Sequence, residues 1–225
     1  MTALFDYPKS TAFGRVVPKN RIYEHAGATS AVKDLFVREV GQIRWAHKLA
    51  PETLNLAATK SVAEIQVFQV TLNTDAAPDE VLRAIDRAIP FPIIFELTQG
   101  DRVQVAAAHK RASEADSAKW VVSDHLRGPW ETADTPRTPL PVALSLGALY
   151  DRILTALMPV EALPGEDIAA RMARLEALQK REREIERLQQ RVNRETQFNI
   201  KVTLHGQLKE AQAAFEHLKK TGEGK

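Results

Sequence analysis

Residues 171–194 constrain the fold of this chain most strongly, because half of them are charged and they carry only a thin apolar stripe. The apolar residues of the stripe fall at a and d positions of a short heptad frame, a pattern typical of paired helices. The frame extends over about three heptads and is imperfect, because charged residues take two of its d positions. The segment therefore predicts a helical hairpin or coiled coil beside a globular domain. The apolar frame residues are Leu178, Ile185, Leu188 and Val192, and the charged ones are Arg181 and Glu195.

The charges of this helix allow three interpretations. Eight bases and four acids lie between residues 171 and 194, whereas the whole chain has a net charge of only +2. The helix can present a solvated face with internal Glu to Arg pairs, an arm that docks on a protein, or a face that contacts phosphates. A phosphate face would bind nucleic acid with little sequence preference and strong salt dependence. The candidate binding residues, for protein or phosphate, are Arg181, Arg187, Arg191, Arg194, Phe198 and Lys201.

The first half of the chain predicts an α+β domain. Its patterns indicate a mixed, mostly antiparallel sheet with covering helices. Gly100 and Asp101 mark the turn of a hairpin, and Pro78 marks the start of a helix. The predicted elements are a helix at about 31–48, strands at 62–72, 91–97, 102–108 and 119–122, and a helix that begins at residue 78.

The proline-rich stretch between Gly128 and Pro141 predicts a linker or an exposed loop. We therefore expect a globular domain with an extended N-terminal arm over residues 1–130, a linker over 131–142, and a helical region over 143–225. Residues 198–204 alternate as in a strand, while Leu204 and the residues after it repeat as in a helix, so the secondary structure of 198–204 stays open. Whether the long helix pairs within the chain or with a second copy also stays open.

Several classes of protein are disfavoured. The chain has no cysteine, which excludes disulfides and thiolate chemistry. It has no signal core and no apolar run long enough to span a membrane, so we expect a cytoplasmic protein without a membrane partner. We find no catalytic, cofactor-binding or metal-binding motif and expect no cofactor. A metal-dependent nuclease around Glu64 and Glu96, with Lys48 or Lys110 as the cation, is the weakest alternative.

Four segments together resemble a bacterial family, domain-of-unknown-function family 4391. They are Pro8-Lys-Ser-Thr with Pro18-Lys and Ile22-Tyr-Glu, the segment from Ile43 to Leu56, Glu64-Ile-Gln-Val-Phe-Gln-Val70, and Glu195-Thr-Gln-Phe-Asn-Ile-Lys-Val-Thr-Leu204.

The resemblance implies a role but no site residues. Members of this family are encoded beside ATP-dependent helicases and DNA methyltransferases in restriction-like or phage-defence clusters. The resemblance therefore implies an accessory subunit with a helicase or methyltransferase as its partner, and nucleic acid as the alternative partner. The family usually has Asn-Arg-Lys-Val-Glu-Leu-Asn where residues 199–205 of this chain read Asn-Ile-Lys-Val-Thr-Leu-His, which weakens a charge-based role for this segment.

Overall fold

The computed structural model describes residues 3–75, 77–112 and 120–222. It divides into two compact units, Met1–Met158 and Pro159–Lys225, which we describe separately. The predicted α+β class is confirmed: the first unit contains a mixed sheet with helices, and the second contains a helical pair. The first unit includes the segment that we expected to be a linker, residues 131–142, together with the helix that follows it.

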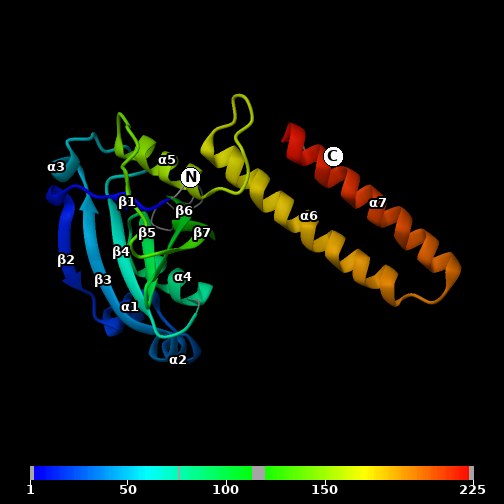
Figure 1. Cartoon of the computed structure of the whole chain (residues 1–225), viewed down its shortest axis with the longest axis horizontal. Helices are drawn as coiled ribbons and strands as arrows, with labels where there is room; N and C mark the ends of the chain where they lie inside the picture. The colour runs from blue at the N-terminus through cyan, green and yellow to red at the C-terminus, as the bar shows by residue number, and fades with distance from the viewer. Residues whose placement is uncertain (1–2, 76, 113–119, 223–225) are drawn as a thin grey trace. The chain divides into compact units, whose positions relative to one another are not determined.

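The first unit is built on a six-stranded sheet with the strand order β2-β3-β4-β5-β6-β7 (Figure 1). Neighbouring strands are antiparallel except β4 and β5, which are parallel and therefore need a crossover, provided by α4. A short parallel pair, β1 with β8, lies outside this sheet. The strands are β1 (Phe5–Asp6), β2 (Ala12–Val16), β3 (Val40–Leu49), β4 (Ile65–Leu72), β5 (Ile93–Gln99), β6 (Arg102–Ala112), β7 (Trp120–Thr132) and β8 (Thr138–Pro139).

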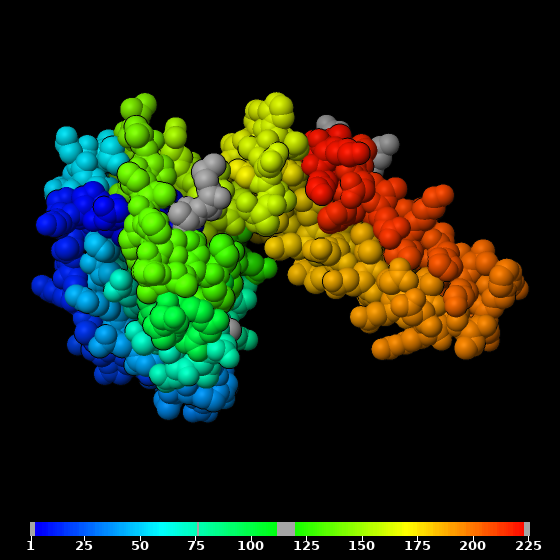
Figure 2. All heavy atoms as spheres, viewed as in Figure 1, coloured from blue at the N-terminus to red at the C-terminus, as the bar shows by residue number. Residues whose placement is uncertain are grey.

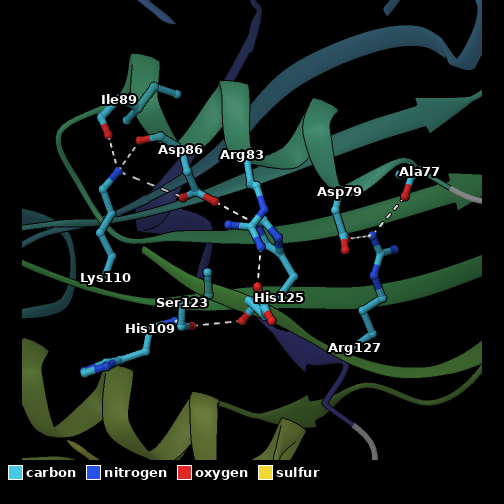
Figure 3. Close-up of polar contacts among 12 residues, drawn as sticks. Ala77, Asp79, Arg83, Asp86, Ile89, His109, Lys110, Ser123, His125 and Arg127 are labelled. Carbon is cyan, nitrogen blue, oxygen red and sulfur yellow. Dashed lines mark hydrogen bonds and ion pairs between the residues drawn. The ribbon is translucent and has the colours of Figure 1, made fainter. Parts of the chain in front are cut away.

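Helices cover the sheet, and the central strands are buried on both faces, because consecutive residues of β4 and β5 are inaccessible. One hydrophobic core packs Phe36, Ile85 and their neighbours against Phe68 and Phe95 of the sheet. In Figure 3 the strands separate α4, which carries Asp86, from α5. The helical elements of this unit are η1 (Lys9–Thr11), α1 (Lys19–Ala26), α2 (Ser30–Glu39), α3 (Pro51–Leu54), α4 (Asp79–Ala88) and α5 (Leu146–Leu157).

The helix predicted at about 31–48 is wrong in its second half. Helix α2 ends at Glu39 and β3 begins directly at Val40. The buried residues of β3 recur every third position, which resembles a helical pattern in sequence. The cause is that β-bulges shift the register of β3 against β4 twice and so break the twofold alternation of a strand. The buried residues are Val40, Ile43, Ala46 and Leu49.

The other predicted elements of the first unit are largely confirmed. Strand β4 lies within the predicted strand at 62–72, and Pro78 is the N-cap of α4. The turn between β5 and β6 contains Gly100, whose φ of 57° lies in the left-handed region. The N-terminal arm is more regular than expected, since its residues include the edge strand β2 and helix α1. Of the strand predicted at 119–122, residue 119 lies outside the described residues.

The second unit consists of two helices, α6 (Ile168–Arg194) and α7 (Phe198–Thr221). They lie side by side, and a short turn at residues 195–197 joins them into an antiparallel hairpin (Figure 1). Residues 198–204, left open above, are therefore helical. The question of what the long helix pairs with is answered within the chain, because α6 pairs with α7. The core of this hairpin consists of Leu188, Val192, Leu204, Leu208 and Ala211.

Two buried tyrosines give a matched test of the packing in the first unit. The Tyr7 hydroxyl is buried with no hydrogen-bond partner among the described residues. The Tyr150 hydroxyl donates to the carbonyl of Ala108 and accepts from the Lys110 amide at 3.2 Å. A buried unsatisfied hydroxyl costs about 1 kcal/mol or more. We therefore expect Tyr7→Phe to raise the free energy of unfolding by about 1 kcal/mol and Tyr150→Phe to lower it by about the same amount.

Urea denaturation followed by tryptophan fluorescence measures this difference, because all three tryptophans lie in the first unit. A loss of stability in Tyr7→Phe equal to that in Tyr150→Phe would show that Tyr7 has a partner in solution.

Candidate docking surface on the helical hairpin

The seam of the hairpin is interrupted at Arg181. Leu178 and Leu188 are buried on either side of this position, whereas Arg181 is half-buried and pairs with Glu184 at 3.0 Å. Two grooves of about 680 and 430 Å³ open here, and both have Arg181, Glu184 and Arg187 in their walls. A charged residue in place of an apolar seam residue therefore leaves the two helices incompletely packed.

The structure separates the six predicted binding residues into two groups. Arg181, Arg187 and Arg191 line the grooves along the hairpin. Arg194 ends α6, while Phe198 and Lys201 begin α7, so these three lie at the end where the chain turns. We call this end of the hairpin, which carries Arg194, Phe198 and Lys201, the tip. Figure 2 shows the side chains of α6 and α7 meeting along the length of the hairpin.

The tip exposes large apolar side chains. The exposed fractions are 78% for Phe198, 43% for Ile200 and 53% for Val202. The carboxylate of Glu195 accepts hydrogen bonds from the backbone amides of Thr196 and Gln197, each at 2.8 Å, and so closes the turn. Phe198 and Val202 are four residues apart and share one face of α7, whereas Ile200 lies on another face, so we call Phe198 and Val202 the tip patch.

Sequence reasoning missed Val202 as a binding residue. The alternation of Phe198, Ile200 and Val202 suggested a strand, but residues spaced by two cannot all lie on the buried stripe of a helix. The buried stripe of α7 includes Leu204 and Leu208, and Ile200 lies in line with it one turn earlier. Phe198 and Val202 project from another face. A helical plot of 198–221 would have found Val202.

Two of the eight bases of residues 171–194 serve the structure of the hairpin base. Arg174 binds the Glu166 carboxylate at 2.6 and 2.8 Å and donates to the carbonyl of Glu161 at 2.6 Å. Arg171 donates to the carbonyl of Val160. Both arginines are buried, so the basic surface of α6 is confined to its part after Leu178.

A buried polar cluster joins α4 to β6 and β7 in the first unit (Figure 3). The Lys110 ammonium donates to the carbonyls of Asp86 and Ile89, and to that of Phe91 at 3.2 Å. His125 Nε2 lies 2.8 Å from Asp86 Oδ2, while its Nδ1 is buried without a partner among the described residues. Burial lowers the pKa of Lys110 to about 8, and the charge of Asp86 opposes this shift. Because these groups are inaccessible, the cluster serves the C-terminal end of α4, where carbonyls lack helical partners.

The carboxylates of the nuclease alternative do not form one site. Glu96 on β5 lies beside Gln69 of β4, whereas Glu64 precedes that position by five residues, which is about 16 Å along a strand. Glu96 is held by Arg137 at 2.6 Å and Glu64 by Lys48 at 3.3 Å. Lys110, the other proposed cation, is buried below α4. Each carboxylate therefore has a separate cation.

Within residues 3–75, 77–112 and 120–222, no group of three or more His, Asp or Glu side chains is placed to hold a metal ion. In the same ranges, every helix is too short or too polar to cross a bilayer.

The chain was also compared with known proteins. The family whose model matches is described as Domain of unknown function (DUF4391), and the match covers residues 5–215. Neither a curated protein nor a solved structure matches the chain. The match includes the sheet, α5, α6 and most of α7.

Proposed function

The chain belongs to the family described as Domain of unknown function (DUF4391), and from that premise we propose that it is a non-catalytic interaction subunit whose helical hairpin docks on a protein partner. We further propose that the partner is a helicase or DNA methyltransferase of a restriction-like defence system, and that the complex acts in the cytoplasm. The single observation that carries the docking role is the exposed tip patch.

The tip patch places two large exposed apolar side chains on one face of the first turns of α7, and such patches mark binding surfaces more often than scattered single residues do. The hairpin below the patch has its own buried core. Because this core holds α7 in place, Phe198 lies on a preformed helix, and little conformational entropy is lost on binding. An aromatic anchor beside arginine is also the composition typical of interface hot spots.

The charges around the tip define the chemistry of the partner. Arg194 is in the last turn of α6 and Lys201 in the first turns of α7, on either side of the turn that exposes Phe198. A complementary site is an apolar pocket with acidic residues on its rim. The basic rim favours fast association and correct register, while the apolar centre provides most of the affinity.

Introduction of a negative charge at the tip tests this proposal. In Phe198→Asp the apolar anchor becomes a buried charge, so we expect the affinity for the co-encoded helicase or methyltransferase to fall at least ~30-fold. Isothermal titration of the full-length protein measures the change. Val37→Asp is the matched control, because Val37 is an exposed aliphatic residue, 69% accessible, on a helix of the first unit. Equal affinity of Phe198→Asp and wild type would exclude the tip as the docking surface.

Nucleic-acid binding is the second candidate, and the basic grooves favour it. Lys180, Arg181, Arg183 and Arg187 line one groove with a single acid, Glu184. Phosphate contacts there would release counterions, so binding would weaken steeply with salt. Titration of the wild type and of Phe198→Asp with duplex DNA at several salt concentrations tests this candidate. Binding that weakens with salt and is equal in the two proteins would favour nucleic-acid binding over the docking role.

A further inference from the structure

Two irregularities of the sheet meet at Ala46 in the first unit, far in sequence from the hairpin. On one side, Ala12 pairs with His47 and Arg15 pairs with Trp45, so Phe13 and Gly14 both lie opposite Ala46. On the other side, Trp45 pairs with Phe68 and His47 with Val67, which leaves Ala46 without a partner on β4. A bulge leaves a residue outside the ladder, re-aims nearby side chains and often lies next to a functional site.

A hollow of about 310 Å³ lies at this point. Gly14 has a φ of 71°, and a Cβ added there would lie 3.2 Å from Nη2 of Arg44. The bulge and the glycine together let the guanidinium of Arg44 lie directly against the backbone of β2. The hollow is lined by Ala12, Phe13, Gly14, Arg44, Ala46, His47 and Gln69.

His47 presents a hydrogen-bond acceptor in this region. The Thr11 hydroxyl donates its one hydrogen to the carbonyl of Pro8 at 2.6 Å, so at 2.9 Å it accepts from Nδ1 of His47. This fixes the tautomer with the proton on Nδ1 and leaves a lone pair on Nε2. Burial lowers the pKa of His47 and so favours the neutral form of the ring. The ring is also stacked on Tyr7, with centroids 4.7 Å apart.

Arg44 and Gln69 add a cation and a second acceptor. Arg44 has no ion pair within the described part of the chain. The amide nitrogen of Gln69 donates to Glu96 at 3.2 Å, so its Oε1 is the remaining polar atom of that side chain. The charged groups near His47 are Glu96, Arg137, Arg44 and Asp6.

These charges do not cancel the cation at Arg44. Arg137 binds both oxygens of Glu96, at 2.6 and 3.0 Å, and neutralises it. Asp6 is exposed, so solvent screens its effect on the hollow.

We propose that this hollow binds a phosphate group in a form that carries a P–OH, either free phosphate or the monoanion of a phosphate monoester, whose second pKa lies near about 6. Two phosphate oxygens accept from the fork of the Arg44 guanidinium, a geometry for which arginine is preorganised. The P–OH donates to Nε2 of His47 or to Oε1 of Gln69. Sulfate has the same shape but no proton to donate at neutral pH, so the two acceptors discriminate against it.

Titration of the full-length protein with inorganic phosphate, observed through the His47 ring signals in carbon–proton NMR spectra, tests this site. We expect a saturable shift with a dissociation constant on the order of 1 mM, and binding of sulfate about 10-fold weaker. A nucleoside monophosphate and free phosphate, titrated in parallel at about pH 6, where about half of the monoester carries a P–OH, distinguish the two sources. Tighter binding of the nucleoside monophosphate indicates a monoester ligand, and equal or weaker binding indicates free phosphate.

Three variants separate the site from general surface charge. Arg44→Gln removes a charge-assisted pair and is expected to weaken phosphate binding about 10-fold. Arg15→Gln removes an exposed cation from β2, the edge strand paired with β3, and is expected to leave binding within about twofold. Asp6→Asn is likewise expected to leave binding within about twofold, because solvent screens the exposed Asp6 carboxylate.

Absence of a saturable His47 shift, or equal weakening by Arg44→Gln and Arg15→Gln, would overturn the proposal. Equal affinity for sulfate and phosphate would overturn the assigned role of the two acceptors.

Discussion

Replacement of Lys110 by methionine is expected to lower the free energy of unfolding of the first unit by ~3–5 kcal/mol. Methionine retains most of the volume of the side chain but leaves the carbonyls of Asp86, Ile89 and Phe91 without the ammonium that they share. It also removes the cation 3.9 Å from the buried carboxylate of Asp86. Unsatisfied buried groups of this kind carry their full desolvation cost.

Thermal unfolding followed by tryptophan fluorescence measures this effect, and the melting temperature should fall by roughly 10 °C. Arg83→Ala is the matched control, because Arg83 is on the same helix, α4, and forms a more exposed ion pair with Asp124 of β7. Exposed pairs contribute at most about 1 kcal/mol. Equal losses in the two variants would show that Lys110 does not stabilise the end of α4.

The same variant also tests the altered titration of Lys110. The pKa of Lys110 is lowered to about 8 by burial, whereas a lysine in the unfolded chain titrates near about 10.4. Between these pH values the unfolded chain binds more protons at this site, so the stability contributed by Lys110 rises with pH. The difference between wild type and Lys110→Met should therefore widen from pH 8 to pH 10. A constant difference would contradict the lowered pKa.

Replacement of Arg137 by alanine is the second large expected loss, again ~3–5 kcal/mol. The Glu96 side chain is 2% exposed, and Arg137 is its partner on both oxygens. Without Arg137, the hydrogen bond from Gln69 is the one that remains to the buried carboxylate within the described part of the chain. Arg137 also donates to the carbonyl of Phe5 at 2.8 Å and so holds the pair β1 and β8 on the sheet.

A double-mutant cycle with Glu96→Gln isolates the pair. Glu96→Gln alone should cost less, about 1–2 kcal/mol, because Arg137 is 35% exposed and can turn to water. The double variant should be more stable than the sum of the two single losses by 0.5 kcal/mol or more, in urea titrations read by tryptophan fluorescence. Strict additivity would mean that the two side chains do not stabilise each other.

Secondary structure was predictable wherever one local pattern dominates. Strand β4 and the β5–β6 turn follow from β-branched residues and from Gly100, which are local signals. The prediction of a helix at 31–48 was wrong in its second half, because the bulges of β3 depend on pairing with distant strands. Such long-range register has no local signature, and its threefold burial pattern is closer to that of a helix than to that of a strand.

The candidate sites were only partly predictable for the same reason. The heptad frame correctly indicated paired helices, and it marked Arg181 as an irregular seam position. It could not show that Arg171 and Arg174 are buried, because their partners lie in the preceding loop. The hollow at Ala46 joins an edge strand to the middle of β3, so no spacing within the sequence indicates it.

The two helices of the hairpin pack on each other along their own seam, so the length of the hairpin can change while this packing is kept. Each residue of a helix adds 1.5 Å, so one heptad inserted into α6 and one into α7 would carry Phe198 about 10 Å further from the hairpin base. Such paired insertions would keep the register of the seam and leave the sheet untouched. Relatives could therefore vary the span of this spacer to suit differently shaped partners while they keep one common sheet domain.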